Sequence, residues 1–422
     1  MQEPSPPPPE APRDGDSWAR LAGSLLYEGK VVQALEAAER GLKVEPRHPM
    51  LQHNRGMALK QLGRMEDAIA ALRLAIELAP GFALAHTNLG TCLIDRGRHD
   101  EAIAAYRAAL AVEPDNPVAR DGLSEALGRS LPSWHFPMLA DVGRNQAYRR
   151  AIEAAVKPGM LVLDIGTGTG LLAMMAARAG AEKVIACEMD PRLAELAREI
   201  VERNGLAAKV TVLARKSTEV AVGRDLPRRA DLIVSEILDS AVIGEGMIPS
   251  MRHALSELAA PGVRIVPAGA EVHAALVEAP GLRRVNPVGM IEGFDLSPFD
   301  RFRNQSSGQP TDLAAEEYRF LSAPMPIYGF DFTRPVPSPR ERWVVVPVTE
   351  SGTVHGIALW FDLKLDDRVT ASTGVGGQMR HWRQTIFFND RDIPVEPGQE
   401  VDLEIGHDDG GWWTTLIPPR AP

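Results

Sequence analysis

Residues 160–170 read MLVLDIGTGTG, a short apolar run that ends in an acid and a glycine-rich turn. The apolar run predicts a buried strand, and the glycines let the backbone approach a ligand closely. Further strand patterns lie at 183–187, 209–214 and 231–235, and helical patterns lie at 171–179 and 191–204. This alternation of strands and helices predicts a doubly wound α/β fold with a parallel sheet.

The glycine-rich turn favours S-adenosylmethionine over a dinucleotide. Gly166, Gly168 and Gly170 have the spacing Gly-x-Gly-x-Gly, whereas the dinucleotide fingerprint is Gly-x-Gly-x-x-Gly. Asp164 ends the strand just before the turn, where it would repel a pyrophosphate. S-adenosylmethionine has no phosphate and carries an α-ammonium, so the acid is favourable there. We therefore predict that this turn binds S-adenosyl-L-methionine.

Two later segments complete the predicted cofactor site. Glu188 ends the second strand, where a carboxylate can accept hydrogen bonds from both ribose hydroxyls. Glu188 and Asp190 could instead form an ordinary helix N-terminus. Ser217 and Glu219 follow the third strand, where an adenine edge would lie, although this segment could also be a surface turn.

The chain before this region repeats with a period of 34 residues. Gly29, Gly63 and Gly97 keep this step, as do Ala34, Ala68 and Ala102, and Pro46, Pro80 and Pro114. The period resembles the tetratricopeptide repeat, a pair of helices that stacks into a superhelix. We predict units at 17–50, 51–84 and 85–118, with a capping helix at 119–129. A plain helical bundle is the alternative.

Composition limits the class of protein. Asp plus Glu number 56 against 46 for Lys plus Arg, a net charge of −10, which disfavours nucleic acid as the main partner. Cys92 and Cys187 cannot form a disulfide framework or a four-ligand zinc site, so no metal is expected. The sequence contains no apolar run of 18 residues, and its first residues lack a signal-peptide pattern. We therefore expect a cytoplasmic protein without a membrane span.

Patterns change along the chain at three places. Residues 1–16 are Pro-rich and predict a disordered tail before the repeat domain at 17–130. The cofactor-binding domain is expected at 131–261. Residues 262–422 alternate apolar and polar positions between turns, as in RWVVVPVTE and EVDLEIGHD, and predict an antiparallel, barrel-like β domain. The irregular stretch 285–325 is an excursion from it.

Four motifs together resemble the protein arginine methyltransferase family. They are WHFPMLADVGRNQAY at 134–148, the glycine-rich turn, SEILDSAVIGEGMIPS at 235–250 and RHWRQTIFF at 380–388. The segments around 215–250 are most similar to member seven of that family, and WHFPML with the repeats is more similar to member nine. The resemblance covers about 132–410. Two departures are Arg380, where the family usually has Thr, and one catalytic core where member seven has two.

The resemblance implies roles for specific residues. Glu236 and Glu245 would be the family's two substrate-binding glutamates, and His381 with Asp141 would accept a proton. Trp382 would form the wall of the substrate site, and Arg144 would bind the cofactor carboxylate. His135 and Met138 are also expected at the cofactor, and Met138 would line the acceptor pocket. Simple packing is the alternative for Met138, and a structural role is the alternative for His381.

Two carboxylates suit a guanidinium acceptor. A guanidinium is cationic at any workable pH, and its lone pairs are delocalised. Glu236 and Glu245 can draw positive charge onto the nitrogens they bind, which leaves electron density on the third nitrogen. The paired contacts also fix its geometry. A solvated acidic loop is the alternative for these two residues.

These patterns predict a protein arginine N-methyltransferase whose repeats recruit protein substrates. Two alternatives remain, namely methylation of a small molecule and a repeat scaffold with a catalytically silent methyltransferase domain. The second would require loss of a glycine or a glutamate, and all are present. By the resemblance, residues 285–325 would be the arm of a two-fold homodimer. The repeats could bind a further protein partner.

Overall fold

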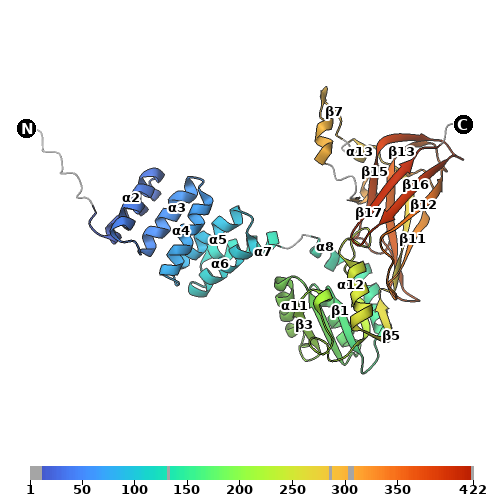
Figure 1. The fold of residues 1–422 in the computed structure, drawn as a ribbon, viewed down its shortest axis with the longest axis horizontal. Coiled ribbons are helices and arrows are strands. Elements are labelled where there is room, and N and C mark those ends of the chain that lie inside the picture. Colours follow the sequence, from blue (N-terminus) through green and yellow to red (C-terminus); the bar gives the residue numbers. More distant parts are fainter. Residues whose placement is uncertain (1–11, 131–133, 285–287, 303–307, 420–422) are drawn as a thin grey trace, which may run out of the picture. The chain divides into compact units, whose positions relative to one another are not determined.

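The computed structural model describes residues 12–130, 134–284, 288–302 and 308–419 (Figure 1). The chain divides into two compact units, Met1–His135 and Phe136–Pro422. Residues 1–11 of the predicted N-terminal tail lie outside the described residues. Within the described ranges, the helices are all too short or too polar to cross a membrane.

The first unit consists of helical pairs that follow the 34-residue period. The pairs are α1 Gly15–Tyr27 with α2 Val31–Val44, α3 Pro49–Gln61 with α4 Met65–Leu78, and α5 Ala83–Asp95 with α6 His99–Val112. Helix α7, Pro117–Ser130, follows the last pair as the predicted capping helix. The predicted helical repeats are therefore confirmed.

The repeated glycines and alanines have different physical reasons. Gly29, Gly63 and Gly97 close the turns with φ of 72°, 75° and 69°, and a Cβ would meet nothing within 4 Å there. Backbone conformation rather than space therefore favours glycine. The alanines at the helix contacts, by contrast, are completely buried (Ala34, Ala68 and Ala102).

The second unit begins with the predicted parallel sheet. Its strands are β1 Leu161–Ile165, β2 Lys183–Glu188, β3 Val210–Ala214, β4 Ala230–Ser235 and β5 Ala259–Val266, in the order β3-β2-β1-β4-β5. The surrounding helices are α9 Val142–Ala155, α10 Leu171–Arg178, α11 Pro191–Arg203 and α12 Met247–His253. Ile165 pairs with Cys187 and with Ser235, so β1, β2 and β4 end at one edge. Residues that follow these strands are thereby brought together.

Strand β5 crosses the domain boundary expected at residue 261. Leu232, Ile233 and Val234 of β4 pair in parallel with Arg264, Ile265 and Val266. Residues 264–266 were expected in the antiparallel domain, as part of 262–422, and this expectation is wrong. A short apolar run looks the same in either sheet, because its pairing partner is not visible in the sequence.

Antiparallel strands form the rest of the second unit. A seven-stranded sheet has the path β10-β6-β13-β15-β9, with β11 on β6 and β14 on β13. Its strands are β6 Gly269–Glu278, β9 Gln309–Thr311, β10 Arg319–Phe320, β11 Met325–Asp331, β13 Gly352–Lys364, β14 Thr370–Ser372 and β15 Gln384–Val395. A second sheet joins β12 Arg340–Pro347, β16 Glu400–His407 and β17 Trp412–Ile417. One buried apolar cluster extends from α9 across the parallel sheet into these strands, which fixes the two parts of the unit against each other.

The excursion predicted at 285–325 is shorter than expected. After α13, Pro280–Arg283, the described part forms a hairpin of β7 Met290–Ile291 and β8 Phe294–Asp295 and the short helix η3 Ser297–Phe302. From β9 onward, the chain pairs again with the antiparallel sheet. Residues 285–287 and 303–307 lie outside the described residues. The hairpin exposes 65% of Met290 and 71% of Phe294.

Candidate active site

The glycine-rich turn follows β1 and leads into α10. Gly166, Gly168 and Gly170 all have positive φ, at 71°, 54° and 82°. A Cβ on Gly166 would also lie 2.2 Å from Ile237, in the loop after β4. The turn therefore requires glycine for its conformation, and at Gly166 for its close approach to the neighbouring loop.

Asp164 presents one unused acceptor beside this turn. It is completely buried, and its Oδ2 accepts hydrogen bonds from the Thr167 hydroxyl at 2.5 Å and the Ala173 N–H at 3.1 Å. Its Oδ1 has no hydrogen-bond partner among the described residues. Burial, with smaller contributions from Glu188 and Glu236, raises the pKa of Asp164 to about 7. A buried acceptor of this kind fits the α-ammonium of S-adenosylmethionine.

Glu188 connects the glycine-rich turn to the next strand and helix. It is 7% exposed, and its Oε2 accepts the Gly168 N–H at 3.0 Å while Oε1 accepts the Asp190 N–H at 2.9 Å. Each carboxylate oxygen can accept a further hydrogen bond. Asp190 caps α11 by accepting the N–H groups of Arg192 and Leu193, which is the alternative role considered for this segment. The ribose role of Glu188 stays a prediction.

Ser217 and Glu219 lie in the short helix η1, Ser217–Glu219, after β3. Ser217 is buried, and its hydroxyl donates to Ser250 Oγ at 3.2 Å in α12. Glu219 is exposed. The structure thus fixes Ser217 against the parallel-sheet part of the unit, and the adenine contacts stay a prediction.

Arg144 and Glu236 form a buried ion pair at the end of β4. Their side chains are 3% and 7% exposed, and Arg144 Nη2 donates to Glu236 Oε2. Arg144 Nη1 donates to Asn145 at 2.7 Å, whereas its Nε has no partner among the described residues. Burial raises the pKa of Glu236, and Arg144 opposes this shift. Arg144, predicted to bind the cofactor carboxylate, is therefore placed against Glu236.

Glu245 adds a further carboxylate to this region. It lies between Gly244 and Gly246 in the loop after β4, and it is exposed. Loss of hydration, followed by the negative charges of Glu236, Asp239 and Glu188, raises its pKa to about 8. Among the described residues, Glu245 forms no ion pair that would compensate its negative charge. A bound guanidinium would supply one.

Asp239 holds the loop that carries both glutamates, a role that the sequence analysis missed. Its Oδ1 accepts the N–H groups of Ala241 and Gly244, both at 3.0 Å. A Cβ on Gly244 would lie 2.2 Å from Asp239 Oδ2, so this glycine makes room for the carboxylate. An Asp two residues before a hydrogen-bonded N–H is typical of an Asx turn, which is the signal available in the sequence.

The loop before β15 contacts α9 and also the loop between β4 and α12, residues 236–246, which carries Glu236 and Glu245 and is called the glutamate loop below. Asp141 caps α9 by accepting the Arg144 N–H at 3.0 Å. Its other oxygen accepts the N–H groups of Arg380 at 2.6 Å and His381 at 3.0 Å. Gly143 allows this approach, because a Cβ there would lie 2.0 Å from the Gln378 carbonyl oxygen. The expected proximity of Asp141 and His381 is thus present in the structure.

His381 is a neutral imidazole at physiological pH. Burial first, and then the positive charge of Arg144, lowers its pKa to about 4, while Asp141 opposes the shift. Its Nδ1 lies 3.3 Å from Asp141 Oδ2. The carboxylate therefore selects the tautomer with a proton on Nδ1, which leaves Nε2 as an acceptor. Burial also raises the pKa of Asp141, but hydrogen bonds from Arg144, His381 and Arg380 outweigh it and keep that pKa low.

Trp382 lies against the glutamate loop with most of its surface buried. It is 4% exposed, and its indole N–H donates to the Leu238 carbonyl at 2.7 Å. The Thr385 hydroxyl similarly donates to the Ser240 carbonyl at 3.2 Å, and the Trp412 indole donates to the Ala241 carbonyl at 2.7 Å. These side chains position the loop backbone. The sequence analysis did not identify Thr385 or Trp412, because isolated residues in strands carry no signal of such contacts.

The remaining two predicted site residues lie in α8, His135–Ala140. Met138 is 8% exposed. His135 closes the first unit, and its ring stacks on Trp134 with the ring centroids 3.9 Å apart. Their proposed contacts with the cofactor stay predictions.

Models of known protein families match the repeats, the parallel-sheet part and the antiparallel part of the chain. Residues 268–410 match the arginine methyltransferase oligomerization subdomain, and residues 149–266 match the ribosomal protein L11 methyltransferase model. Residues 20–83 and 59–126 match tetratricopeptide repeat models.

Similar proteins include arginine methyltransferases from several organisms. An arginine N(omega)-methyltransferase of Streptomyces achromogenes subsp. streptozoticus is 38% identical over 289 residues, which cover 68% of this chain and 80% of that protein. Protein arginine N-methyltransferase 7 of Oryza sativa subsp. indica is 37% identical over 310 residues, covering 65% of this chain and 43% of the rice protein. The chain thus spans most of the bacterial relative and less than half of the rice protein.

Solved structures share the fold at lower identity. The Trypanosoma brucei PRMT1 enzyme–prozyme complex with AdoHcy aligns with a TM-score of 0.58 and 23% identity, covering 69% of this chain and 99% of that one. Arabidopsis thaliana protein arginine methyltransferase 10 aligns with a TM-score of 0.55 and 22% identity, covering 67% and 97%.

The class defined by the fold and the cofactor site is thus that of the S-adenosylmethionine-dependent methyltransferases. Within this class, the chain belongs to the arginine methyltransferase family and carries tetratricopeptide repeats before its catalytic core.

We expect Glu188→Ala to weaken binding of S-adenosylhomocysteine by about 1–3 kcal/mol, because a charged acceptor near the glycine-rich turn is lost. Calorimetry measures this affinity directly. Glu199→Ala is the matched control, since Glu199 is an exposed glutamate on α11 that pairs with Arg203. Unchanged affinity in Glu188→Ala would count against the ribose role.

Proposed function

We propose that the chain transfers a methyl group to a guanidinium nitrogen of a protein arginine, held by Glu236 and Glu245. The observation that carries this proposal is the excess of carboxylates in the glutamate loop. Arg144 compensates Glu236, whereas the charges that act on Glu245 are the negative ones of Glu236, Asp239 and Glu188. A fork-shaped cation is the ligand that two carboxylates bind best, because each can accept paired hydrogen bonds from it.

In this proposal, the glutamates orient the substrate and His381 accepts the proton that is released. S-adenosylmethionine, when bound, supplies an electrophilic methyl group. Glu236 and Glu245 orient the guanidinium and withdraw positive charge from the nitrogen that reacts. That nitrogen loses a proton as it gains the methyl group, and neutral His381 can accept this proton at Nε2. Asp141 stabilises the resulting imidazolium through Nδ1.

The stacked repeats support a protein substrate. Tetratricopeptide repeats form an extended curved surface suited to binding another chain, and we propose that they recruit the substrate. A free arginine is the second candidate, because the similar Streptomyces protein is named an arginine methyltransferase without reference to protein. The two candidates differ in kcat/KM for an arginine-containing peptide against free arginine, and we expect the peptide to be preferred.

Changing either glutamate to glutamine should abolish most of the turnover. Glu245→Gln and Glu236→Gln keep the side-chain shape but remove a charge that stabilises the reacting guanidinium. We expect turnover to fall at least about 100-fold, or roughly 2.7 kcal/mol, with affinity for S-adenosylhomocysteine little changed. Transfer of labelled methyl groups to an arginine-rich peptide measures turnover. Near-normal turnover in Glu245→Gln would show that Glu245 does not hold the reacting guanidinium.

Binding of an arginine peptide should release protons below pH 8. The pKa of Glu245 is raised to about 8 from 4.5, so its ionisation destabilises the folded protein as pH rises across that range. At pH 7 Glu245 is mostly protonated, and the guanidinium must displace its proton. Calorimetry in two buffers of different ionisation enthalpy counts the released protons, which we expect to number about one at pH 7 and to vanish above pH 9.

Glu245→Gln is the control for this proton release. We expect the variant to release far fewer protons on binding the same peptide. Equal release in both proteins would assign the proton to another group, and no release in the natural chain at pH 7 would contradict the raised pKa.

We also propose that the catalytic unit forms a two-fold dimer through the β7–β8 hairpin. The hairpin lies in the segment that matches the oligomerization subdomain, and it exposes large apolar side chains. Such exposure is costly unless a partner covers it. Light scattering at micromolar concentration should give a dimer, and Phe294→Asp should shift it towards monomer. A fully active monomer of the natural chain would reject this assembly.

A further inference from the structure

The outer face of the β12-β16-β17 sheet exposes an unusual combination of side chains. Burial alternates along β12, where Val344 and Val346 are buried and Trp343 and Val345 are 59% and 47% exposed. Strand pairing then determines which residues share the outer face, because paired residues point to the same side of a sheet. Trp343 pairs with Glu404, and Val345 pairs with Asp402. The exposed Trp343 thus lies opposite one acid, Glu404, and diagonal to another, Asp402.

Carboxylates line this face along its length. Register places Glu341, Asp402, Glu404 and Glu400 on it, opposite or diagonal to Trp343 and Val345. Within the described parts of the chain, none of these four forms an ion pair. The nearby Glu341 carboxyl is the main reason why the pKa of Glu404 is raised. Like charges on neighbouring strands are destabilising, so this arrangement lacks a structural benefit.

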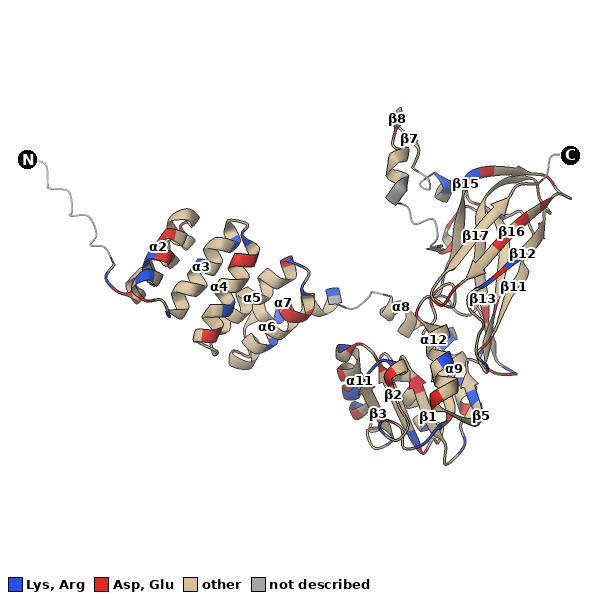
Figure 2. Cartoon of the chain, in the orientation of Figure 1, with Lys and Arg blue, Asp and Glu red and all other residues tan. Residues whose placement is uncertain are grey.

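The arginines of β12 do not neutralise the face. Arg342 alternates with Glu341 and Trp343, so its side chain lies on the other side of the sheet. There it donates to the Ile327 carbonyl and lies over the Tyr328 ring, 5.6 Å from the ring centroid. Figure 2 shows the acidic segments on this sheet.

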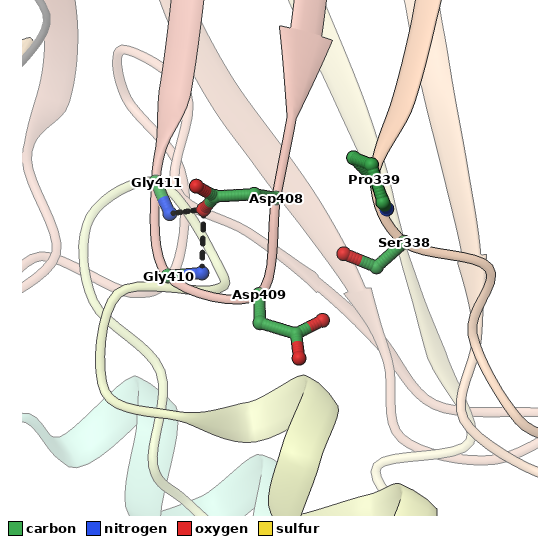
Figure 3. A pocket seen from close by; sticks show the side chains of 6 residues that line it. All are labelled: Ser338, Pro339, Asp408, Asp409, Gly410 and Gly411. Carbon is green, nitrogen blue, oxygen red and sulfur yellow. Dashed lines mark hydrogen bonds between the residues drawn. The ribbon is translucent and has the colours of Figure 1, made fainter.

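A shallow acidic hollow continues this surface at the end of the sheet. It is lined by Ser338, Pro339 and the β16–β17 turn from Asp408 to Gly411 (Figure 3). Asp408 accepts the N–H groups of Gly410 and Gly411 at 2.8 and 2.9 Å, which fixes the turn. Asp409 pairs with Arg252 of α12 at 2.9 Å.

The hollow lies next to the glutamate loop. The strand that leaves the turn begins with Trp412, whose indole N–H donates to the Ala241 carbonyl between Glu236 and Glu245. The eight residues of β12 make the sheet face about 26 Å long at ~3.3 Å per residue. The hollow and this end of the sheet face are therefore close in the fold to the loop that carries Glu236 and Glu245.

We propose that the hollow and the outer face of β12-β16-β17 form a docking surface for arginine-rich segments next to the methylated arginine. This inference rests on the proposed function, since it assumes a protein substrate with several arginines. The four carboxylates of the sheet face, which form no ion pair among the described residues, complement the charge of such a segment, whereas Asp409 at the hollow is already paired with Arg252. Trp343 can stack with a guanidinium, which is the cation that binds tryptophan faces most often. A protein that methylates arginines meets such segments as its substrate.

The test compares two peptides and three variants. One peptide carries a single arginine and no other charge, and the other adds about ten flanking residues rich in arginine. The docking variants are Glu341→Gln/Asp402→Asn/Glu404→Gln and Trp343→Ala. The control variant, Glu316→Gln/Glu317→Gln/Glu396→Gln, removes as many exposed charges elsewhere in the β domain.

We expect the docking variants to raise KM for the long peptide roughly five- to tenfold at low salt, with kcat unchanged. The short peptide and the control variant should show no change. Unchanged KM for the long peptide, or an equal rise for both peptides, would overturn the docking surface. A shift of the triple variant from dimer to monomer in light scattering would instead identify the face as an interface between copies, and would also overturn it.

Direct binding separates this inference from the proposed function. Fluorescence anisotropy of the labelled long peptide reports docking without turnover. Binding that is lost in the triple variant supports the docking surface even if neither peptide is methylated, and in that case the proposed function fails alone.

Discussion

The site depends on an imbalance of charge around one buried arginine. Arg144 pairs with Glu236 where the parallel sheet ends. Burial first, and then the positive charge of this arginine, lowers the pKa of His381 and keeps it neutral. Glu245, in the same loop, has carboxylates as its electrostatic neighbours. A folded protein normally avoids such an arrangement, because each unpaired charge in a partly buried site costs free energy. A site that binds a cationic ligand can retain such unpaired carboxylates, because the ligand neutralises them.

The rest of the second unit maintains this imbalance by holding three segments together. Asp141 joins the first turn of α9 to the loop before β15, and Asp239 closes the loop after β4 on itself. Indole N–H groups of Trp382 and Trp412 then attach the antiparallel strands to the glutamate loop. The two parts of the unit therefore act as a single framework, and the carboxylates cannot easily move apart to relieve their repulsion.

Local patterns in the sequence predicted the fold well where the deciding interactions join residues that are close in the chain. The helical repeats follow from Gly29, Gly63 and Gly97, which close their turns with positive φ, and from the alanines buried between helices. The parallel sheet follows from its apolar runs. Strand β5 was misassigned, because pairing between distant segments decides whether Arg264–Val266 joins the parallel or the antiparallel sheet. Trp412 and Thr385 were missed for the same reason, since their contacts are with residues far apart in sequence. Asp239 was missed although its contacts with Ala241 and Gly244 are local.

Some site residues were predicted from strand patterns, and others were predicted only from family resemblance. Asp164 and Glu188 follow from strand ends, and the structure brings both to the glycine-rich turn. His381 and Asp141 came from family resemblance, and the structure brings them together as well. Their chemical roles depend on substrate and cofactor contacts that are set only on binding.

The most direct test of arginine methylation is mass spectrometry of amino acids from a protein incubated with the enzyme and isotope-labelled S-adenosylmethionine. Labelled methyl groups on arginine side-chain nitrogens are the predicted result, and label confined to another residue or to a small molecule would contradict the assignment.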